Sequence, residues 1–375
     1  MILDSFSLKD QLFNVVKVRG LAAEIEAAHP EFDADGFVQD CVARFPELEL
    51  KARVTWMSEC LRNHLPPDYR TAVGVILAAL PAPNDPTLSD NDFGDFIHAP
   101  YPEFVALYGA TEQDVDFSLE ALRQITMRFS AEYAIRTFIN KFPDLAMDAL
   151  LRWSKDDHYH VRRLASEGTR PSLPWGQNVS IKPELAVPIL HNLFHDKTRF
   201  VTRSVANHVN DITKKDPELA LRLLSEWQSS GRQDEREMMF ITKHSLRTLI
   251  KRGHPESLRM LGLAPDCEVE LSDLVAPSAV AMDSELEFSF SLKAEVDTRV
   301  IVDFAIHFVN KRGASTRKVF KLKEFTLQSG IASIVTKRHM LKRVMTTRTL
   351  YPGQHSLEIL VNGASLGHHD FHLSE

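Results

Sequence analysis

A segment that opens with proline followed by an acidic residue recurs along the first two thirds of this 375-residue chain. The prolines are Pro102, Pro143, Pro183, Pro217 and Pro255, so successive segments start 41, 40, 34 and 38 residues apart. Proline and an acidic side chain both suit the first turn of a helix, where backbone N–H groups lack intrahelical partners and the helix dipole is positive. Leu, Ile, Phe and Ala then recur at three- and four-residue spacing, as in an amphipathic helix. A repeat of about 40 residues that holds one helix pair predicts an α-solenoid.

The hydrophobic period changes near residue 264. Strings such as ELEFSFSLKAEV and TRVIVDFAIHFVN alternate apolar and polar residues, which is the pattern of half-buried strands. The dipeptide Asn362-Gly363 is a strong signal for a two-residue hairpin turn. We therefore expect an all-α HEAT-like α-solenoid over residues 1–264, followed by a small all-β immunoglobulin-like sandwich domain over residues 265–375.

Composition narrows the class of protein. The chain is 44% hydrophobic and 25% charged, and it has no apolar run of the ~18 residues that a transmembrane helix needs. Charges interrupt the apolar stretch at the N-terminus, so residues 1–13 do not read as a signal peptide. The three cysteines, Cys41, Cys60 and Cys267, are odd in number and far apart, which fits a reducing compartment. We predict a cytoplasmic monomer with no cofactor and no metal site.

The charge is distributed unevenly along the chain. The formal net charge is −7, but residues 1–150 carry −12, residues 151–260 carry +6 and residues 261–375 carry −1. A basic segment inside an acidic protein is typical of a surface that meets phosphate groups. The alternative is chance clustering on a solvated face.

Arginines recur with the helical repeat. Arg163, Arg203 and Arg247 lie 40 and 44 residues apart in similar segments, and stacked repeats would place equivalent positions side by side. Such a ladder of arginines, with Lys197 and Arg199 nearby, can follow a phosphate backbone. The alternative is that these arginines bridge neighbouring repeats through Asp and Glu.

The segment LLRWSKDDHYHVRR offers groups for chemistry. At helical spacing, Arg152 lies over Asp156 and Trp153 lies over Asp157, and Glu120 from an upstream segment can join them. A cationic aromatic ligand would meet a ring and carboxylates there. The alternative places Trp153 in the core and uses the aspartates as surface charges or helix caps.

The segment from Pro171 to Trp175, Pro-Ser-Leu-Pro-Trp, cannot be helical because two prolines fix its backbone. A rigid loop with Arg170 on one side and Trp175 on the other could present side chains to a ligand. Its alternative role is a stiff connector between repeats.

The run RRLASEGTRPSLPW, from Arg162 to Trp175, resembles the signature of the AlkC branch of the AlkC/AlkD DNA alkylation repair glycosylases, which are built from HEAT-like repeats. The segments VTRSVANHVNDITKKDPELAL, KHSLRTLIKRGHPESLRMLG and FPELELKARVTWMSECLRNHLPPDY are also similar to that family. The resemblance spans most of residues 1–264. Some members carry a C-terminal immunoglobulin-like domain, in agreement with the alternating segments above.

The resemblance implies an activity: hydrolysis of the N-glycosidic bond of cationic N-alkylated bases, such as 3-methyladenine and 3-methylcytosine, in base excision repair. It also implies action on alkylated double-stranded DNA without a tight base-flipping pocket. We expect Asp156 or Asp157 to be the catalytic carboxylate, with Glu120 as a second one, and Arg152 and Trp153 to frame the lesion. The residues that we expect to contact DNA are Arg162, Arg163, Arg170, Trp175, Lys197, Arg199, Arg203, Lys243 and Arg247. The alternative function is a non-catalytic HEAT-repeat scaffold that binds protein or nucleic acid.

Overall fold

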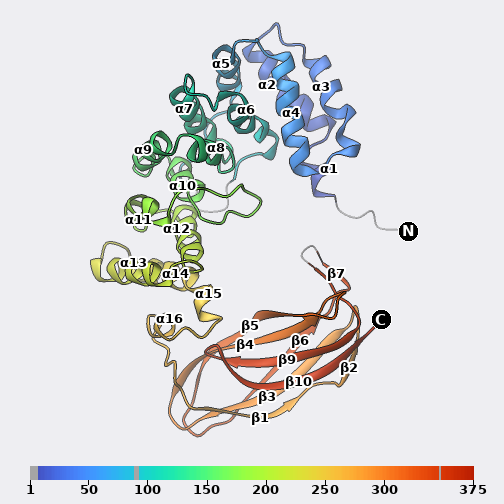
Figure 1. The fold of residues 1–375 in the computed structure, drawn as a ribbon, viewed down its shortest axis with the longest axis vertical. Helices are drawn as coiled ribbons and strands as arrows, with labels where there is room; N and C mark the ends of the chain where they lie inside the picture. Colours follow the sequence, from blue (N-terminus) through green and yellow to red (C-terminus); the bar gives the residue numbers. More distant parts are fainter. Residues whose placement is uncertain (1–6, 88–92, 346–347) are drawn as a thin grey trace. The chain divides into compact units, whose positions relative to one another are not determined.

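The structure is a computed structural model and describes residues 7–87, 93–345 and 348–375 (Figure 1). Residues 1–6, the start of the stretch that lacks a signal-peptide pattern, lie outside the described residues. The chain forms two compact units, the first made of residues 1–215 and 227–241 and the second of residues 216–226 and 242–375. No described helix is long and apolar enough to cross a membrane.

Helices make up the first part of the chain. They are α1 (Leu8–Leu12), α2 (Val15–Ala28), α3 (Ala34–Ala43), α4 (Leu50–His64), α5 (Tyr69–Ala79), α6 (Pro100–Gly109), α7 (Val115–Thr126), α8 (Ala134–Lys141), α9 (Pro143–Trp153), α10 (Tyr159–Gly168), α11 (Val187–Leu193), α12 (Arg199–Ile212), α13 (Pro217–Ser230), α14 (Glu235–Ser245), α15 (Arg247–Ile250) and α16 (Pro255–Arg259). Short 3-10 turns stand at η1 (Phe45–Glu47), η2 (Phe96–His98) and η3 (Pro183–Ala186). The predicted order, a helical region before a β region, is confirmed.

Most of the predicted helix starts are helix starts in the structure. Helices α9, α13 and α16 begin at Pro143, Pro217 and Pro255. Pro102 falls in the first turn of α6, which begins two residues earlier. Pro183 opens the 3-10 turn η3 instead of an α-helix. The reason is Pro188, near the start of α11, which has no N–H to donate to the carbonyl four residues earlier.

Helices α10 and α12 pack against each other and frame the loop that links α10 to α11. Helix α10 buries Val161, Leu164 and Ala165, and α12 buries Val201 and Val205, so each helix turns one apolar stripe inward. The polar side chains next to these stripes therefore meet between the two helices.

The second unit contains two sheets. Its strands are β1 (Val269–Val275), β2 (Ala279–Ala281), β3 (Glu285–Ala294), β4 (Thr298–Val309), β5 (Ser315–Leu327), β6 (Ser333–Met340), β7 (Val344–Met345), β8 (Arg348–Thr349), β9 (Gly353–Val361) and β10 (Ala364–Ser374). One sheet has the order β1-β3-β6 and the other β2-β10-β9-β4-β5, while β7 and β8 form a small hairpin. The pairs are antiparallel except β2 with β10, which is parallel.

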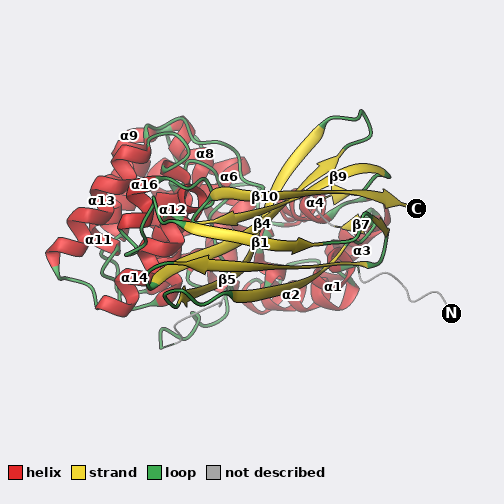
Figure 2. Cartoon of the chain, turned by 90° about the horizontal axis from the view of Figure 1, so that it is seen from below, coloured by secondary structure: helices red, strands yellow, loops and turns green. Residues whose placement is uncertain are grey.

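The two sheets enclose one hydrophobic core. Alternate residues of β3, among them Phe288 and Phe290, belong to this core, and Phe288 packs against Phe304 of β4. Figure 2 shows most of the strands lying roughly along one axis. The predicted hairpin turn is confirmed, because Asn362 and Gly363 join β9 to β10 with φ of 47° and 78°, as a two-residue hairpin turn requires.

The last helical residues belong to the second unit. The Asn362 side chain donates to the Ala264 carbonyl at 3.0 Å and Arg299 donates to the Leu261 carbonyl at 3.1 Å. At Gly363 a Cβ would lie 2.3 Å from the Cα of Gly253, so the two glycine backbones touch. The domain boundary at residues 264 and 265 stays a prediction; residues 242–264 pack on the β sandwich.

Candidate active site

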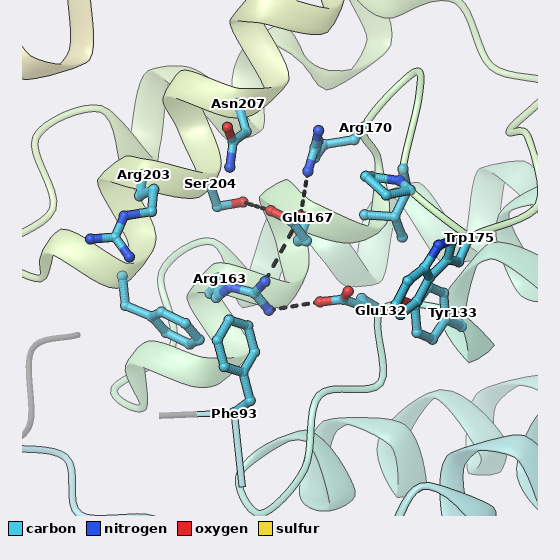
Figure 3. A pocket seen from close by; sticks show the side chains of 13 residues that line it. Phe93, Glu132, Tyr133, Arg163, Glu167, Arg170, Trp175, Arg203, Ser204 and Asn207 are labelled. Carbon is cyan, nitrogen blue, oxygen red and sulfur yellow. Dashed lines mark hydrogen bonds and ion pairs between the residues drawn. The ribbon is translucent and has the colours of Figure 1, made fainter. Parts of the chain in front are cut away.

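The segment RRLASEGTRPSLPW forms the second half of α10 and the loop after it, and it lines a pocket of the first unit (Figure 3). The pocket has a volume of about 280 Å³. Its walls come from the residues before α8, from α10 and α12, and from the loop. The lining residues are Phe93, Glu132, Tyr133, Arg163, Glu167, Arg170, Leu173, Pro174, Trp175, Phe200, Arg203, Ser204 and Asn207.

Glu167, at the end of α10, is the buried carboxylate of this pocket. Its Oε1 accepts a hydrogen bond from Arg170 at 2.6 Å and its Oε2 accepts one from the Ser204 hydroxyl at 2.6 Å. Arg163 lies 3.8 Å from Oε1. Burial disfavours the charged form, but Arg163 and Arg170 outweigh burial and hold the pKa of Glu167 below its usual value. Glu167 is therefore ionised at neutral pH, with both oxygens engaged.

The two arginines beside Glu167 are themselves buried, with 7% exposure for Arg163 and 6% for Arg170. Arg163 donates to Glu132 at 2.9 Å, and its guanidinium lies 4.4 Å from the ring centroid of Phe200. Arg170 donates to Asp211 at 2.9 Å. Each guanidinium thus lies between two carboxylates, so its charge is already balanced inside the protein.

Glu132 is held differently from Glu167. Its Oε2 accepts hydrogen bonds from Arg163 and from the Ser130 hydroxyl, both at 2.9 Å. Its Oε1 accepts none from any residue that the structure describes, and the side chain is 13% exposed. Figure 3 shows Glu132 between Arg163 and the ring of Tyr133. Burial and the nearby carboxylates, Glu132 first, raise the pKa of Tyr133 to about 12. Glu132 is thus an oriented carboxylate with one open oxygen in the pocket wall.

Trp175 stands at the mouth of the pocket with an exposure of 68%. The Gly176 N–H donates to the Leu173 carbonyl at 3.1 Å and closes a tight turn, in which Pro174 is second and Trp175 third. Trp175 has φ of 64°, as the third residue of a type II turn requires, where glycine is the usual choice. A bulky residue with positive φ persists only where its surroundings hold it, and such residues cluster at functional sites.

Arg136, on α8, holds the loop at its base. The residue is fully buried, and its guanidinium donates to the carbonyls of Gly168 and Arg170, each at 2.9 Å, and to that of Gln177 at 2.5 Å. Burial, and then the charge of Arg170, lower the pKa of Arg136 to about 10. One turn later on α8, Asn140 donates to the loop backbone at 2.9 Å. The loop is therefore fixed to α8 and does not move as a free connector.

The predicted catalytic cluster does not line this pocket. The Asp156 side chain is 8% exposed and forms an ion pair with Arg123 at 2.6 Å. It also accepts a hydrogen bond from the N–H of His158, the N-cap residue of α10, at 2.9 Å. Trp153 is 6% exposed and lies in the core. The core position of Trp153 agrees with the alternative interpretation of this segment.

The other members of the cluster are at the surface. Glu120 pairs with Arg123 at 3.2 Å and is half exposed, and the side chains of Arg152 and Asp157 are exposed. The structure brings Glu120 and Asp156 to the same arginine, as the sequence analysis expected of neighbouring segments. The catalytic role of these residues stays a prediction, and the geometry favours the Glu132 pocket.

Several predicted DNA-binding arginines have carboxylate partners on neighbouring helices. Arg162 forms an ion pair with Asp196 at 2.5 Å, and Arg199 donates to Glu237 at 2.8 Å. Both pairs join consecutive helical segments, as the alternative interpretation of the arginine ladder holds. Arg203 differs from them because it lies in the pocket wall.

The remaining predicted DNA contacts are spread over both units. Lys197 is exposed. Lys243 forms an ion pair with Glu324 within the second unit. Arg247 starts α15 and donates to the His244 carbonyl at 2.5 Å. Arg247, which lies 44 residues after Arg203 in the predicted ladder, is therefore the first residue of a helix.

Sequence reasoning predicted Arg163, Arg170 and Trp175 as DNA contacts, and all three line the pocket. It assigned no chemistry to Glu132 or Glu167. Glu167 stands inside the quoted motif, four residues after Arg163 and three before Arg170, a spacing that indicates ion pairs on one helix. That signal was available. Glu132 lies in the turn before α8, and nothing in its immediate sequence marks it.

Histidines near the pocket are buried and neutral. Burial lowers the pKa of His160 to about 3 and that of His208 to about 4. Within the described ranges, no group of three or more His, Cys, Asp or Glu side chains is placed to hold a metal ion.

Comparisons with known proteins show the family of both parts of the chain. The family model described as "DNA alkylation repair enzyme" matches residues 110–246, and the model described as "Uncharacterised protein YhaZ, C-terminal Ig-like domain" matches residues 270–375. The first match contains the pocket residues from Glu132 to Asn207. The second shows that the β domain is immunoglobulin-like.

Two relatives match almost the whole chain. The uncharacterized protein YhaZ of Bacillus subtilis (strain 168) is 31% identical over 358 residues, which cover 94% of this chain and 96% of YhaZ. The alkylpurine DNA glycosylase AlkC of Pseudomonas fluorescens, solved bound to DNA with an abasic site analog, is 36% identical, with a TM-score of 0.88 over 99% of this chain and 100% of that one. The chain belongs to the AlkC-type family of DNA alkylation repair glycosylases.

Proposed function

We propose that this chain hydrolyses the N-glycosidic bond of cationic N-alkylated bases, 3-methyladenine and 3-methylcytosine, in double-stranded DNA. The observation that carries this proposal is the pocket in which Glu132 keeps an open carboxylate oxygen near the exposed ring of Trp175. The similar AlkC structure, which is bound to DNA that contains an abasic site analog, supports the choice of DNA as partner and of base release as the reaction.

Release of a cationic base requires few catalytic groups from the protein. A base alkylated at such a ring nitrogen carries positive charge, so it can leave without being protonated. As the bond breaks, the sugar gains oxocarbenium character. A fixed carboxylate stabilises that charge and can orient the attacking water. We assign this role to Glu132.

The neighbours of Glu132 determine which of its oxygens faces the substrate. Arg163 and Ser130 both bind Oε2, which leaves Oε1 for the sugar or the water. Glu167 cannot take the same role, because Arg170 and Ser204 occupy its two oxygens. We therefore assign Glu167 as a positioning residue that fixes Arg163, and through Arg163 it fixes Glu132.

Trp175 and the shape of the pocket suit a cationic base. An indole face attracts a cation that lies over it. The cavity of about 280 Å³ is slightly smaller than the roughly 300–1,000 Å³ typical of small-molecule pockets. Enzymes that flip a base hold it in a snug pocket. An open mouth with a largely exposed tryptophan supports excision without such a pocket.

We propose fewer DNA-contacting residues than the sequence analysis predicted. Residues 151–260 carry a net charge of +6. Lys197 is exposed and Arg203 lies in the pocket wall, so these two are the side chains that we assign to phosphates. A HEAT-like stack of the helix pairs and a monomeric, cytoplasmic enzyme are part of the same proposal.

The test is release of base from duplex oligonucleotides that contain one 3-methyladenine or one 3-methylcytosine, measured under single-turnover conditions. We expect Glu132→Gln to lower the rate at least about 100-fold, because the variant loses the charge that stabilises the transition state. The competing site is tested by Asp156→Asn, and Glu184→Gln, at an exposed glutamate, is the matched control.

The outcomes separate the hypotheses. Full activity in Glu132→Gln together with loss of activity in a folded Asp156→Asn would move the site to the Asp156 cluster. If the wild-type protein releases neither base, the proposed function is wrong, and the non-catalytic scaffold that binds protein or nucleic acid takes its place.

A further inference from the structure

Lys51, in the first turn of α4, joins the tip of the pocket loop to the N-terminal helices. Its ammonium donates to the Trp175 carbonyl at 2.7 Å across 124 residues of sequence. The same nitrogen lies 5.9 Å from the ring centroid of Tyr133. Both partners line the pocket, whereas Lys51 itself does not. Lys51 therefore contacts two pocket residues from outside.

The turn at Trp175 does not fix its own conformation. The hydrogen bond from Gly176 to Leu173 closes a type I turn as well as a type II turn, and the third residue has negative φ in the first and positive φ in the second. A tryptophan prefers negative φ. The turn alone therefore does not hold Trp175, at a φ of 64°, in place.

Among the described contacts, the one from Lys51 ties Trp175 to another part of the chain. Arg136 and Asn140 hold the loop at Gly168, Arg170, Gln177 and Asn178, all outside the turn. At the tip, the bond from Lys51 is the hydrogen bond that the Trp175 backbone makes to another part of the described chain. A charged donor makes this bond stronger than one between neutral groups.

We propose that Lys51 is a positioning residue, which ties the Trp175 carbonyl to α4 and so holds Trp175 at the mouth of the active site. The part of this inference that concerns catalysis rests on the proposed glycosylase function. The alternative for an exposed lysine near such a site is direct contact with a DNA phosphate.

The first measurement is independent of activity. The chain has four tryptophans, so the protein labelled with 5-fluorotryptophan gives four fluorine NMR resonances, and Trp175→Phe identifies one of them. In Lys51→Met we expect the Trp175 resonance to move or split while the other three stay in place. Lys51→Arg, which keeps a charged donor, should restore it. Lys182→Met, which removes a positive charge from an exposed side chain near the loop, should leave all four unchanged.

The second measurement is a double-mutant cycle on single-turnover excision of 3-methyladenine. We expect Lys51→Met to lower the rate about tenfold, or about 1.4 kcal/mol, with an unchanged salt dependence of DNA binding. In a Trp175→Ala background the same change should have no further effect, because Lys51 acts through Trp175.

Three results would overturn the proposal. One is a Trp175 resonance that does not respond to Lys51→Met, and another is a resonance that responds in an active enzyme whose excision rate stays unchanged. The third is an additive loss in the Trp175→Ala background with a salt slope lower by about one unit, which would make Lys51 a phosphate contact. If the wild-type protein excises no base, the proposed function fails, and the resonance alone decides whether Lys51 holds Trp175 in place.

Discussion

The ion network around Glu167 predicts how much the first unit depends on one buried charge. Glu167→Gln keeps the shape of the side chain but removes the carboxylate that Arg163 and Arg170 share. Removal of one partner from a buried ion pair costs about 3–5 kcal/mol when the other charge is left alone. Here each arginine keeps one carboxylate, Glu132 or Asp211, both at 2.9 Å. We therefore expect a loss of about 2 kcal/mol in the free energy of unfolding, below that range.

The direction of the Glu167 pKa shift predicts how the stability difference between wild type and variant changes with pH. The pKa of Glu167 is lower in the folded protein than its usual value, so its stabilising effect is complete above the unfolded pKa of about 4.3. The effect is lost as the pH falls through the lower folded pKa. The difference between wild type and Glu167→Gln should be constant near neutral pH and should shrink below about pH 4.

The assay is urea unfolding together with thermal unfolding, at pH 7 and at several values below pH 5, with Glu184→Gln as the exposed control. At pH 7 the melting temperature should fall by about 4–8 °C, as about 2 kcal/mol implies for a domain of about 150–250 residues. Equal stability of wild type and variant at pH 7 would refute the reasoning, because the network would then contribute nothing. A difference that persists unchanged at low pH would show that the lost shape, and not the lost charge, is responsible.

Three further predictions concern the loop, the second unit and DNA binding. Arg136→Met should speed amide hydrogen exchange in residues 168–177 and lower stability by about 3 kcal/mol, because the buried carbonyls of Gly168 and Arg170 and the more exposed one of Gln177 lose their donor; unchanged exchange there would contradict this. Gly363→Ala, whose new Cβ would lie 2.3 Å from another backbone, should lower the melting temperature more than Gly330→Ala, which has a similar positive φ and nothing within 4 Å. Equal effects would mean that the close approach is unimportant. Lys197→Ala should lower the salt slope of DNA binding by about one unit, whereas Arg163→Ala should not change it, and the opposite result would restore Arg163 as a phosphate contact.

Most of the fold could be predicted from the periodicity of hydrophobic residues in the sequence. The change in period near residue 264 placed helices before strands, and the Pro-acidic segments marked helix starts at Pro143, Pro217 and Pro255. Periodicity shows which face of a helix is apolar, but not which body that face packs against. The packing of residues 242–264 on the β sandwich therefore could not be predicted.

Only part of the candidate site could be predicted from the sequence. The motif from Arg162 to Trp175 forms much of the pocket wall, and its unusual composition marked it. The carboxylates were sought at local spacing, which led to Asp156. Glu132 meets Arg163 from 31 residues away and from a different helical segment, and no local pattern encodes such a contact. For the same reason, the count of charges along the sequence did not reveal that Arg162 is paired, because its partner Asp196 comes from the next helical segment.

The contact between Gly253 and Gly363 bears on how such a two-part gene can be assembled. A recombination event that supplied only residues 265–375 would deliver a sandwich whose Asn362 and Arg299 lack the Ala264 and Leu261 carbonyls that they bind here. A transferred piece must therefore include the short helices α15 and α16 together with the sandwich. The workable joint for gene fusion lies upstream, inside the helical sequence, and not at the point where helices give way to strands.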